Sequence, residues 1–142
     1  MTQVFASWHP VEGIDQPCAD ISFSYSAPSK LRVTMHFSRT AGALRDDLEI
    51  DFEGAVGLLW MEESAHSVAE RMQSPLPKCH DLKWANWTFP LLVVSNSEWL
   101  SKIEALPLSQ QRVHFLLVSM NDIVEVLALR PPSAKWVVPH EA

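Results

Sequence analysis

Two apolar runs in the last third of the chain predict a β-hairpin. They are Val113–Val118 and Ile123–Leu129, and the turn-forming pair Asn121-Asp122 separates them. Both runs have the length of a strand and are rich in Val, Leu, Ile and Phe. Because they are nearly continuous in apolar residues, both faces should be covered, and we expect this hairpin at the centre of a sheet. Pro131-Pro132 ends the second strand, since proline cannot donate to a ladder.

A regular alternation of apolar and polar residues predicts a second hairpin nearer the N-terminus. Ala19–Ser26 and Leu31–Phe37 both alternate, and Pro28-Ser29-Lys30 forms a plausible turn between them. The apolar side of the first segment consists of Ile21, Phe23 and Tyr25. The opposite side of the two segments consists of Ser22, Ser24, Ser26, Arg32, Thr34 and His36. This pattern is typical of half-buried strands.

Asp47–Glu53 has the clearest alternation in the chain, with an apolar side opposite an acidic side. The apolar side is Leu48, Ile50 and Phe52, and the acidic side is Asp47, Glu49, Asp51 and Glu53. Gly54 and Gly57 then interrupt an apolar continuation, and glycine within a strand pattern suggests a bulge or a turn. The segment is therefore either one bent strand from Leu48 to Met61 or two strands around Gly54.

Three further segments have strand character. Val4–Trp8 fits a short strand, and Ala134–Val138 fits a final one. Trp87–Val94 contains Pro90, which favours a position at a sheet edge or a bulge.

The best helical pattern covers Ser97–Leu106, where apolar residues recur on one stripe and Pro107 follows as a stop. Ser95 and Glu98 fit a capping box in front of it. A second helix is possible near residues 64–73. We therefore expect a mainly β (α+β) fold of residues 1–142 in one domain, as an antiparallel sheet or sandwich with one firm helix near 97–106.

The net charge of −6 is concentrated in the first half of the chain, and the stretch from Asp46 to Glu63 carries seven acids and no base. Phosphates are bound by Lys and Arg, so this balance argues against nucleic acid as the ligand. It is compatible with a basic protein partner.

The apolar runs are too short to span a bilayer, and the N-terminal residues lack the pattern of a signal peptide. We expect a cytoplasmic protein that does not bind membranes. In that compartment Cys18 and Cys79 should remain free thiols.

Chemical motifs give no positive sign of an enzyme. The six histidines are scattered, no glycine-rich phosphate loop is present, and Cys79-His80-Asp81 are sequence neighbours, whereas catalytic groups usually meet across a fold. We expect no catalytic residues, no metal site and no cofactor.

Two groups of residues are candidates for binding. The acidic side Asp47, Glu49, Asp51 and Glu53 would present four carboxylates to a basic partner, with no base interleaved along the segment. Trp84 and Trp87, beside Lys83 and Asn86, form an alternative site for a sugar or another small ligand.

Three segments together resemble small uncharacterised bacterial proteins. They read LEIDFEGAVGLLWMEES, FPLLVVSNSEWLSKI and VHFLLVSMNDIVEVLA. Some proteins of this group are similar to immunity proteins of bacterial toxin systems. The resemblance covers roughly residues 30–132 and carries no catalytic motif.

We therefore expect a non-enzymatic, acidic protein-binding module, plausibly an immunity protein that neutralises a bacterial toxin. The alternatives are a β-sandwich that binds a small ligand or carbohydrate, and a structural subunit that oligomerises through an exposed strand.

Overall fold

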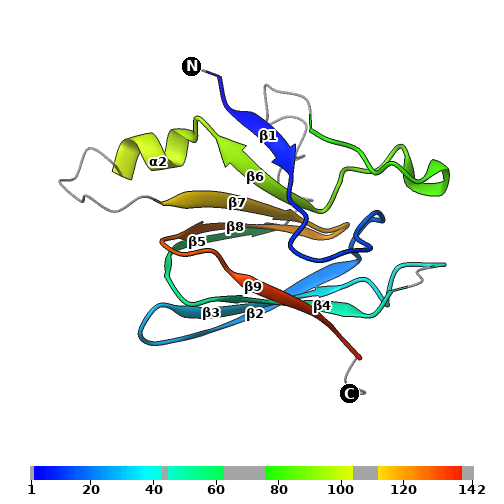
Figure 1. Ribbon diagram of the computed structural model, residues 1–142, viewed down its shortest axis with the longest axis horizontal. Coiled ribbons are helices and arrows are strands. Elements are labelled where there is room, and N and C mark those ends of the chain that lie inside the picture. The colour runs from blue at the N-terminus through cyan, green and yellow to red at the C-terminus, as the bar shows by residue number, and fades with distance from the viewer. Residues whose placement is uncertain (1, 43–44, 63–75, 104–111, 139–142) are drawn as a thin grey trace.

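Two antiparallel sheets packed face to face form the protein, as seen in a computed structural model that describes residues 2–42, 45–62, 76–103 and 112–138 (Figure 1). One sheet has the strand order β1-β6-β7-β8-β5, and the other β2-β3-β4-β9. The strands of the first sheet are β1 (Val4–Ser7), β6 (Leu91–Ser95), β7 (Val113–Val118), β8 (Asp122–Ala128) and β5 (Ala55–Glu62). Those of the second are β2 (Asp20–Ser26), β3 (Lys30–His36), β4 (Asp47–Phe52) and β9 (Ser133–Val137). The predicted mainly β, antiparallel sandwich is confirmed.

The β7–β8 hairpin forms the middle of the five-stranded sheet, as its apolar runs predict. Phe115 and Val126 are directly opposite one another, and both are buried. Asp122 is already the first residue of β8, so the turn lies just before it. Aromatic contacts join this hairpin to the other sheet and to the N-terminal segment, because Phe115 packs against Phe52 and Trp8 with ring centroids 5.5 and 4.6 Å apart.

Gly54 separates two strands, which resolves the alternatives for Leu48–Met61. β4 belongs to the four-stranded sheet and β5 to the five-stranded sheet. The carbonyl of Gly54 accepts a hydrogen bond of 2.9 Å from the amide of Leu129. A register shift between Ala55 and Gly57 marks a bulge in β5. The glycines therefore mark the point at which the chain crosses from one sheet to the other.

The expected edge position or bulge for the strand around Pro90 is wrong. β6 begins at Leu91, after the proline, and lies between β1 and β7. Because Pro90 precedes the strand, it does not have to donate a hydrogen bond to a neighbouring strand. Its carbonyl accepts from the amide of Val118 at 2.8 Å. The proline ends the preceding loop and leaves the strand uninterrupted.

The expected capping box is also wrong. Ser95 is the last residue of β6, and the helix α2 spans Glu98–Ile103. The hydroxyl of Ser97 accepts from the amide of Leu100 at 3.1 Å, which is the N-cap geometry. The remainder of the predicted helix 97–106, and the possible second helix at 64–73, lie outside the described residues.

The thiols of Cys18 and Cys79 are both free, as expected, and the structure places both in the interior. Burial is the main cause that raises the pKa of each thiol, that of Cys79 to about 11. Among the described residues, no helix has both the length and the apolar character needed to cross a membrane.

Candidate functional site

The outer side of the four-stranded sheet is polar, and residues from all four strands contribute to it. Directly opposed residues in neighbouring strands share a face, so the register joins Ser24, Arg32, Asp51 and Ser133 in one row and Ser22, Thr34, Glu49 and Lys135 in the next. A third row contains Asp20, His36 and Asp47, of which the last two are in contact. We call these residues the polar face.

Three of the four predicted acids lie on this face. Asp47, Glu49 and Asp51 alternate along β4, while Leu48 and Ile50 between them are completely buried on the other side. Glu53 follows the last residue of β4 and is exposed in the turn before Gly54. The predicted row of carboxylates is thus present over β4, with Glu53 just beyond its end.

Bases from the neighbouring strands lie among these acids, so the expectation of an uncompensated acidic row is wrong. Arg32 on β3 contacts Asp51 at 2.8 Å and Glu49 at 3.3 Å, and Lys135 on β9 lies 3.8 Å from Glu49. The hydrogen bond and charge of Asp51, followed by the charge of Glu49, raise the pKa of the Arg32 guanidinium. The polar face therefore combines fixed carboxylates with long, solvent-exposed cationic side chains.

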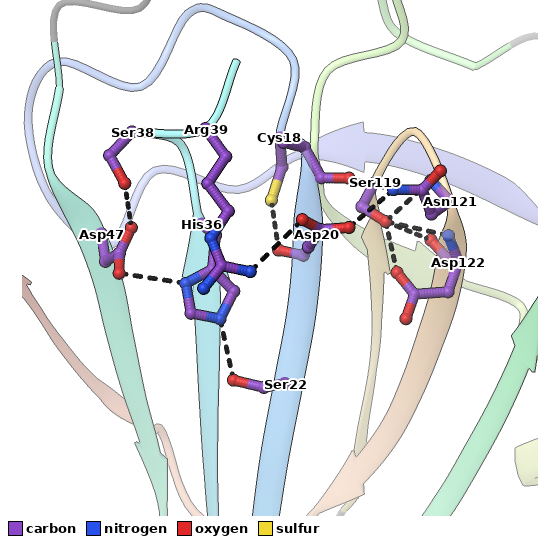
Figure 2. Close-up of polar contacts among 11 residues, drawn as sticks. Cys18, Asp20, Ser22, His36, Ser38, Arg39, Asp47, Ser119, Asn121 and Asp122 are labelled. Atoms are coloured by element: carbon purple, nitrogen blue, oxygen red, sulfur yellow. Dashed lines mark hydrogen bonds and ion pairs between the residues drawn. The ribbon is translucent and has the colours of Figure 1, made fainter. Parts of the chain in front are cut away.

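Asp47 differs from the other acids because it is buried within a chain of side-chain hydrogen bonds (Figure 2). One carboxylate oxygen accepts from the hydroxyl of Ser38 at 2.7 Å, and the other contacts Nδ1 of His36 at 3.0 Å. Nε2 of His36 lies 2.9 Å from the hydroxyl of Ser22. Since an ionised carboxylate only accepts, Nδ1 of His36 donates to Asp47, and in the neutral imidazole Nε2 is then the atom that accepts from the serine hydroxyl. Asp47 is therefore occupied by internal contacts.

The order Ser22–His36–Asp47 is that of a hydrolase triad, in which the imidazole can take the proton of the serine. A hydrolase also needs donors for the oxyanion and a cavity that holds the substrate. A shallow groove on this face is lined by Ser24, Ser26, Arg32, Asp51 and Glu53, towards the opposite end of the strands. Ser22 is exposed on the sheet surface, outside this groove. Within the described residues, these contacts orient Asp47 and His36, and the groove of this face lies away from Ser22.

A second series of hydrogen bonds between a serine, a histidine and an acid lies under α2. Ser97 at the N-cap contacts Nδ1 of His114 at 2.7 Å, and Nε2 of His114 lies 2.9 Å from Glu125. All three residues are buried, and the ring of Trp99 packs edge-on against His114 with centroids 5.5 Å apart. These hydrogen bonds connect the first turn of the helix to His114 on β7 and Glu125 on β8.

The two candidate tryptophans have different surroundings. Trp84 is at the end of a 3₁₀ turn, Leu82–Trp84, and is partly buried against the core, with Nζ of Lys83 4.9 Å from its ring centroid. Trp87 is 44% exposed. Trp84 is thus partly packed against the core, whereas somewhat less than half of Trp87 is exposed to solvent.

Sequence reasoning missed the contacts of His36 and Arg32 with the acidic row, and the contact of Ser22 with His36. The alternation in the first hairpin does place these three residues on its polar side. What it lacks is the register between β3 and β4, which is needed to bring His36 opposite Asp47 and Arg32 opposite Asp51. Cross-strand register was therefore the missing information.

A scan against protein-family models and searches of curated proteins and of solved structures give no match to this chain. Its function is therefore inferred from its own residues.

Proposed function

We propose that this chain is a non-enzymatic protein-binding module that docks a basic partner on its polar face, with Glu49 and Asp51 of that face, and Glu53 just beyond it, as the contact acids. Following the resemblance in its sequence, we propose that it acts in the cytoplasm as an immunity protein against a bacterial toxin. The observation that carries the proposal is the fixed position of Glu49 and Asp51, held from below by buried residues of β4 and from the side by Arg32.

Binding would proceed by exchange of ion pairs. The side chains of Arg32 and Lys135 are 52% and 66% exposed, whereas that of Glu49 is only 12% exposed. The cations can therefore turn away into solvent while the carboxylates stay in place. A partner that supplies its own Lys or Arg side chains would then meet acids that are already oriented, which lowers the ordering cost of association.

Asp47 has a supporting role in this proposal. Its contacts with His36 and Ser38 fix the first residue of β4 and leave little of its carboxylate for a partner. The net charge of −6 adds a long-range attraction to a basic protein, which acts mainly on the rate of association.

The experiment begins with affinity purification of the tagged chain from its native host and identification of a protein that co-elutes. The two proteins are then purified separately and mixed. We expect a stoichiometric complex that Glu49→Gln/Asp51→Asn weakens by at least tenfold. For a toxin, co-expression of this chain should also restore growth.

A matched control removes the same charge elsewhere. Glu62→Gln/Glu98→Gln replaces two exposed acids outside the polar face, so both double variants change the net charge from −6 to −4. If the two variants weaken the complex equally, total charge governs binding and the proposed site is wrong. If the purified proteins form no complex, the proposed function is wrong.

A further inference from the structure

β2 forms one edge of the four-stranded sheet, and its apolar side is largely uncovered. In the described parts of the chain, β3 is its only hydrogen-bonded neighbour. Phe23 and Tyr25 lie opposite Val33 and Leu31, which belong to the core, so their side chains are on the inner side of the sheet. They are nevertheless 40% and 58% exposed. Apolar side chains on the inner side of the sheet are therefore exposed to solvent along this edge.

The other three edge strands carry features that discourage pairing with another chain. β1 has only four residues, and β5 contains the bulge between Ala55 and Gly57. β9 follows Pro131-Pro132 and carries Lys135. β2 has none of these features, because it is seven residues long and contains no charge from Ile21 to Ser26. It is the edge best suited to accept a further strand.

We propose that two copies of this chain pair through β2, antiparallel and around a two-fold axis, and so join their four-stranded sheets into one of eight strands. This inference is independent of the proposed binding function. An antiparallel pair that keeps both sheet faces aligned places odd-numbered residues opposite odd-numbered ones. Phe23 and Tyr25 then meet the same apolar side of the other copy, and Ser22, Ser24 and Ser26 meet its serines.

Charge at the two ends of β2 also favours a second copy as the occupant. Asp20, which also lies 3.4 Å from Arg39 of its own chain, begins the strand, and Lys30 of β3 lies opposite Ser26 at its end. An antiparallel arrangement brings Asp20 of each copy towards Lys30 of the other. Aromatic pairs across the strands would cover surface that is exposed in the single chain, and such cross-strand pairs stabilise sheets.

The test uses Ser24, which would lie near the two-fold axis and therefore close to Ser24 of the second copy. Sedimentation equilibrium of the full chain should give a mass that approaches twice 16.0 kDa as concentration rises. Ser24→Lys and Ser24→Glu should each weaken self-association at least tenfold by placing like charges together. An equimolar mixture of the two variants should restore the dimer, because opposite charges then meet.

Ser133→Lys is the matched control, since Ser133 is exposed on β9 at the other edge of the same sheet and the variant should dimerise like the parent. Glu49→Gln/Asp51→Asn should also leave the dimer intact, which separates this inference from the proposed function. A parent chain that remains monomeric up to millimolar concentration would overturn the inference. So would a dimer that survives Ser24→Lys, or a folded mixture that fails to recover it.

Discussion

Two series of hydrogen bonds, Ser22–His36–Asp47 and Ser97–His114–Glu125, contain the same kinds of side chain but differ in the exposure of the serine. In the first, serine faces Nε2 of the imidazole and the acid faces Nδ1, whereas in the second these positions are reversed. The first lies on the polar face and ends at an exposed serine. In the second, the serine is buried, and Ser97 also caps a helix.

Burial decides what each chain contributes. Under α2, the polar groups are buried and form hydrogen bonds with protein partners in place of water. If one partner is removed, the other stays desolvated without that hydrogen bond, which lowers the free energy of unfolding. On the polar face, water can replace Ser22 beside His36. We infer that the buried chain stabilises the fold, while the exposed one mainly orients Asp47 at the start of the proposed binding strand.

The largest expected difference comes from removal of the two imidazoles. His114→Ala removes a buried side chain together with its contacts to Ser97, Glu125 and the ring of Trp99, so it should cost about 3 kcal/mol or more, in the range for a broken buried network. His36→Ala should cost about 1 kcal/mol, because Asp47 keeps its bond to Ser38. Denaturant unfolding measures both, and equal losses would contradict the division into a structural and a peripheral chain.

A smaller difference should separate two serines that flank the same turn. Ser97→Ala removes the N-cap and the contact with His114, so we expect a loss of about 1–2 kcal/mol. Ser95→Ala changes an exposed residue at the end of β6 and should alter the free energy of unfolding by less than about 0.5 kcal/mol. The reverse order in thermal or denaturant unfolding would restore the capping box at Ser95.

The smallest expected effect belongs to Ser22. Ser22→Ala should change the free energy of unfolding by less than about 0.5 kcal/mol, since the hydroxyl is exposed. A fluorophosphonate, which labels activated serines, should not modify the parent chain at this position. Labelling that both Ser22→Ala and His36→Ala abolish would instead identify a nucleophilic serine and require an enzymatic function.

The sequence predicts those parts of the fold that local patterns determine. The β7–β8 hairpin follows from two nearly continuous apolar runs, and the β2–β3 hairpin from strict alternation around a short turn. The N-cap could not be chosen in the same way, because Ser95 and Ser97 both precede a helical pattern. The extension of β6 to Ser95 decides between them, and that extension depends on pairing with β1.

The candidate site needed information from distant segments. Alternation correctly puts Asp47, Glu49 and Asp51 on one side of a strand, but it does not reveal the cations beside them. Lys135 reaches Glu49 only because β9 pairs with β4 from the far end of the chain. Because Arg32 pairs with both acids and Lys135 with Glu49, replacing Glu49 and Asp51 by neutral residues should slightly lower stability.

The central claim is that Glu49 and Asp51 form a binding surface that the fold does not require. Its most direct test is the association rate constant with the purified partner, measured by stopped flow at low and high salt. For the parent chain, we expect the rate to fall steeply as salt rises, because exposed charges are screened over about 10 Å at 0.1 M. Glu49→Gln/Asp51→Asn should remain folded, associate several-fold more slowly at low salt than Glu62→Gln/Glu98→Gln, and depend less on salt. Equal rates for the two double variants, or association of the parent that is insensitive to salt, would contradict the claim.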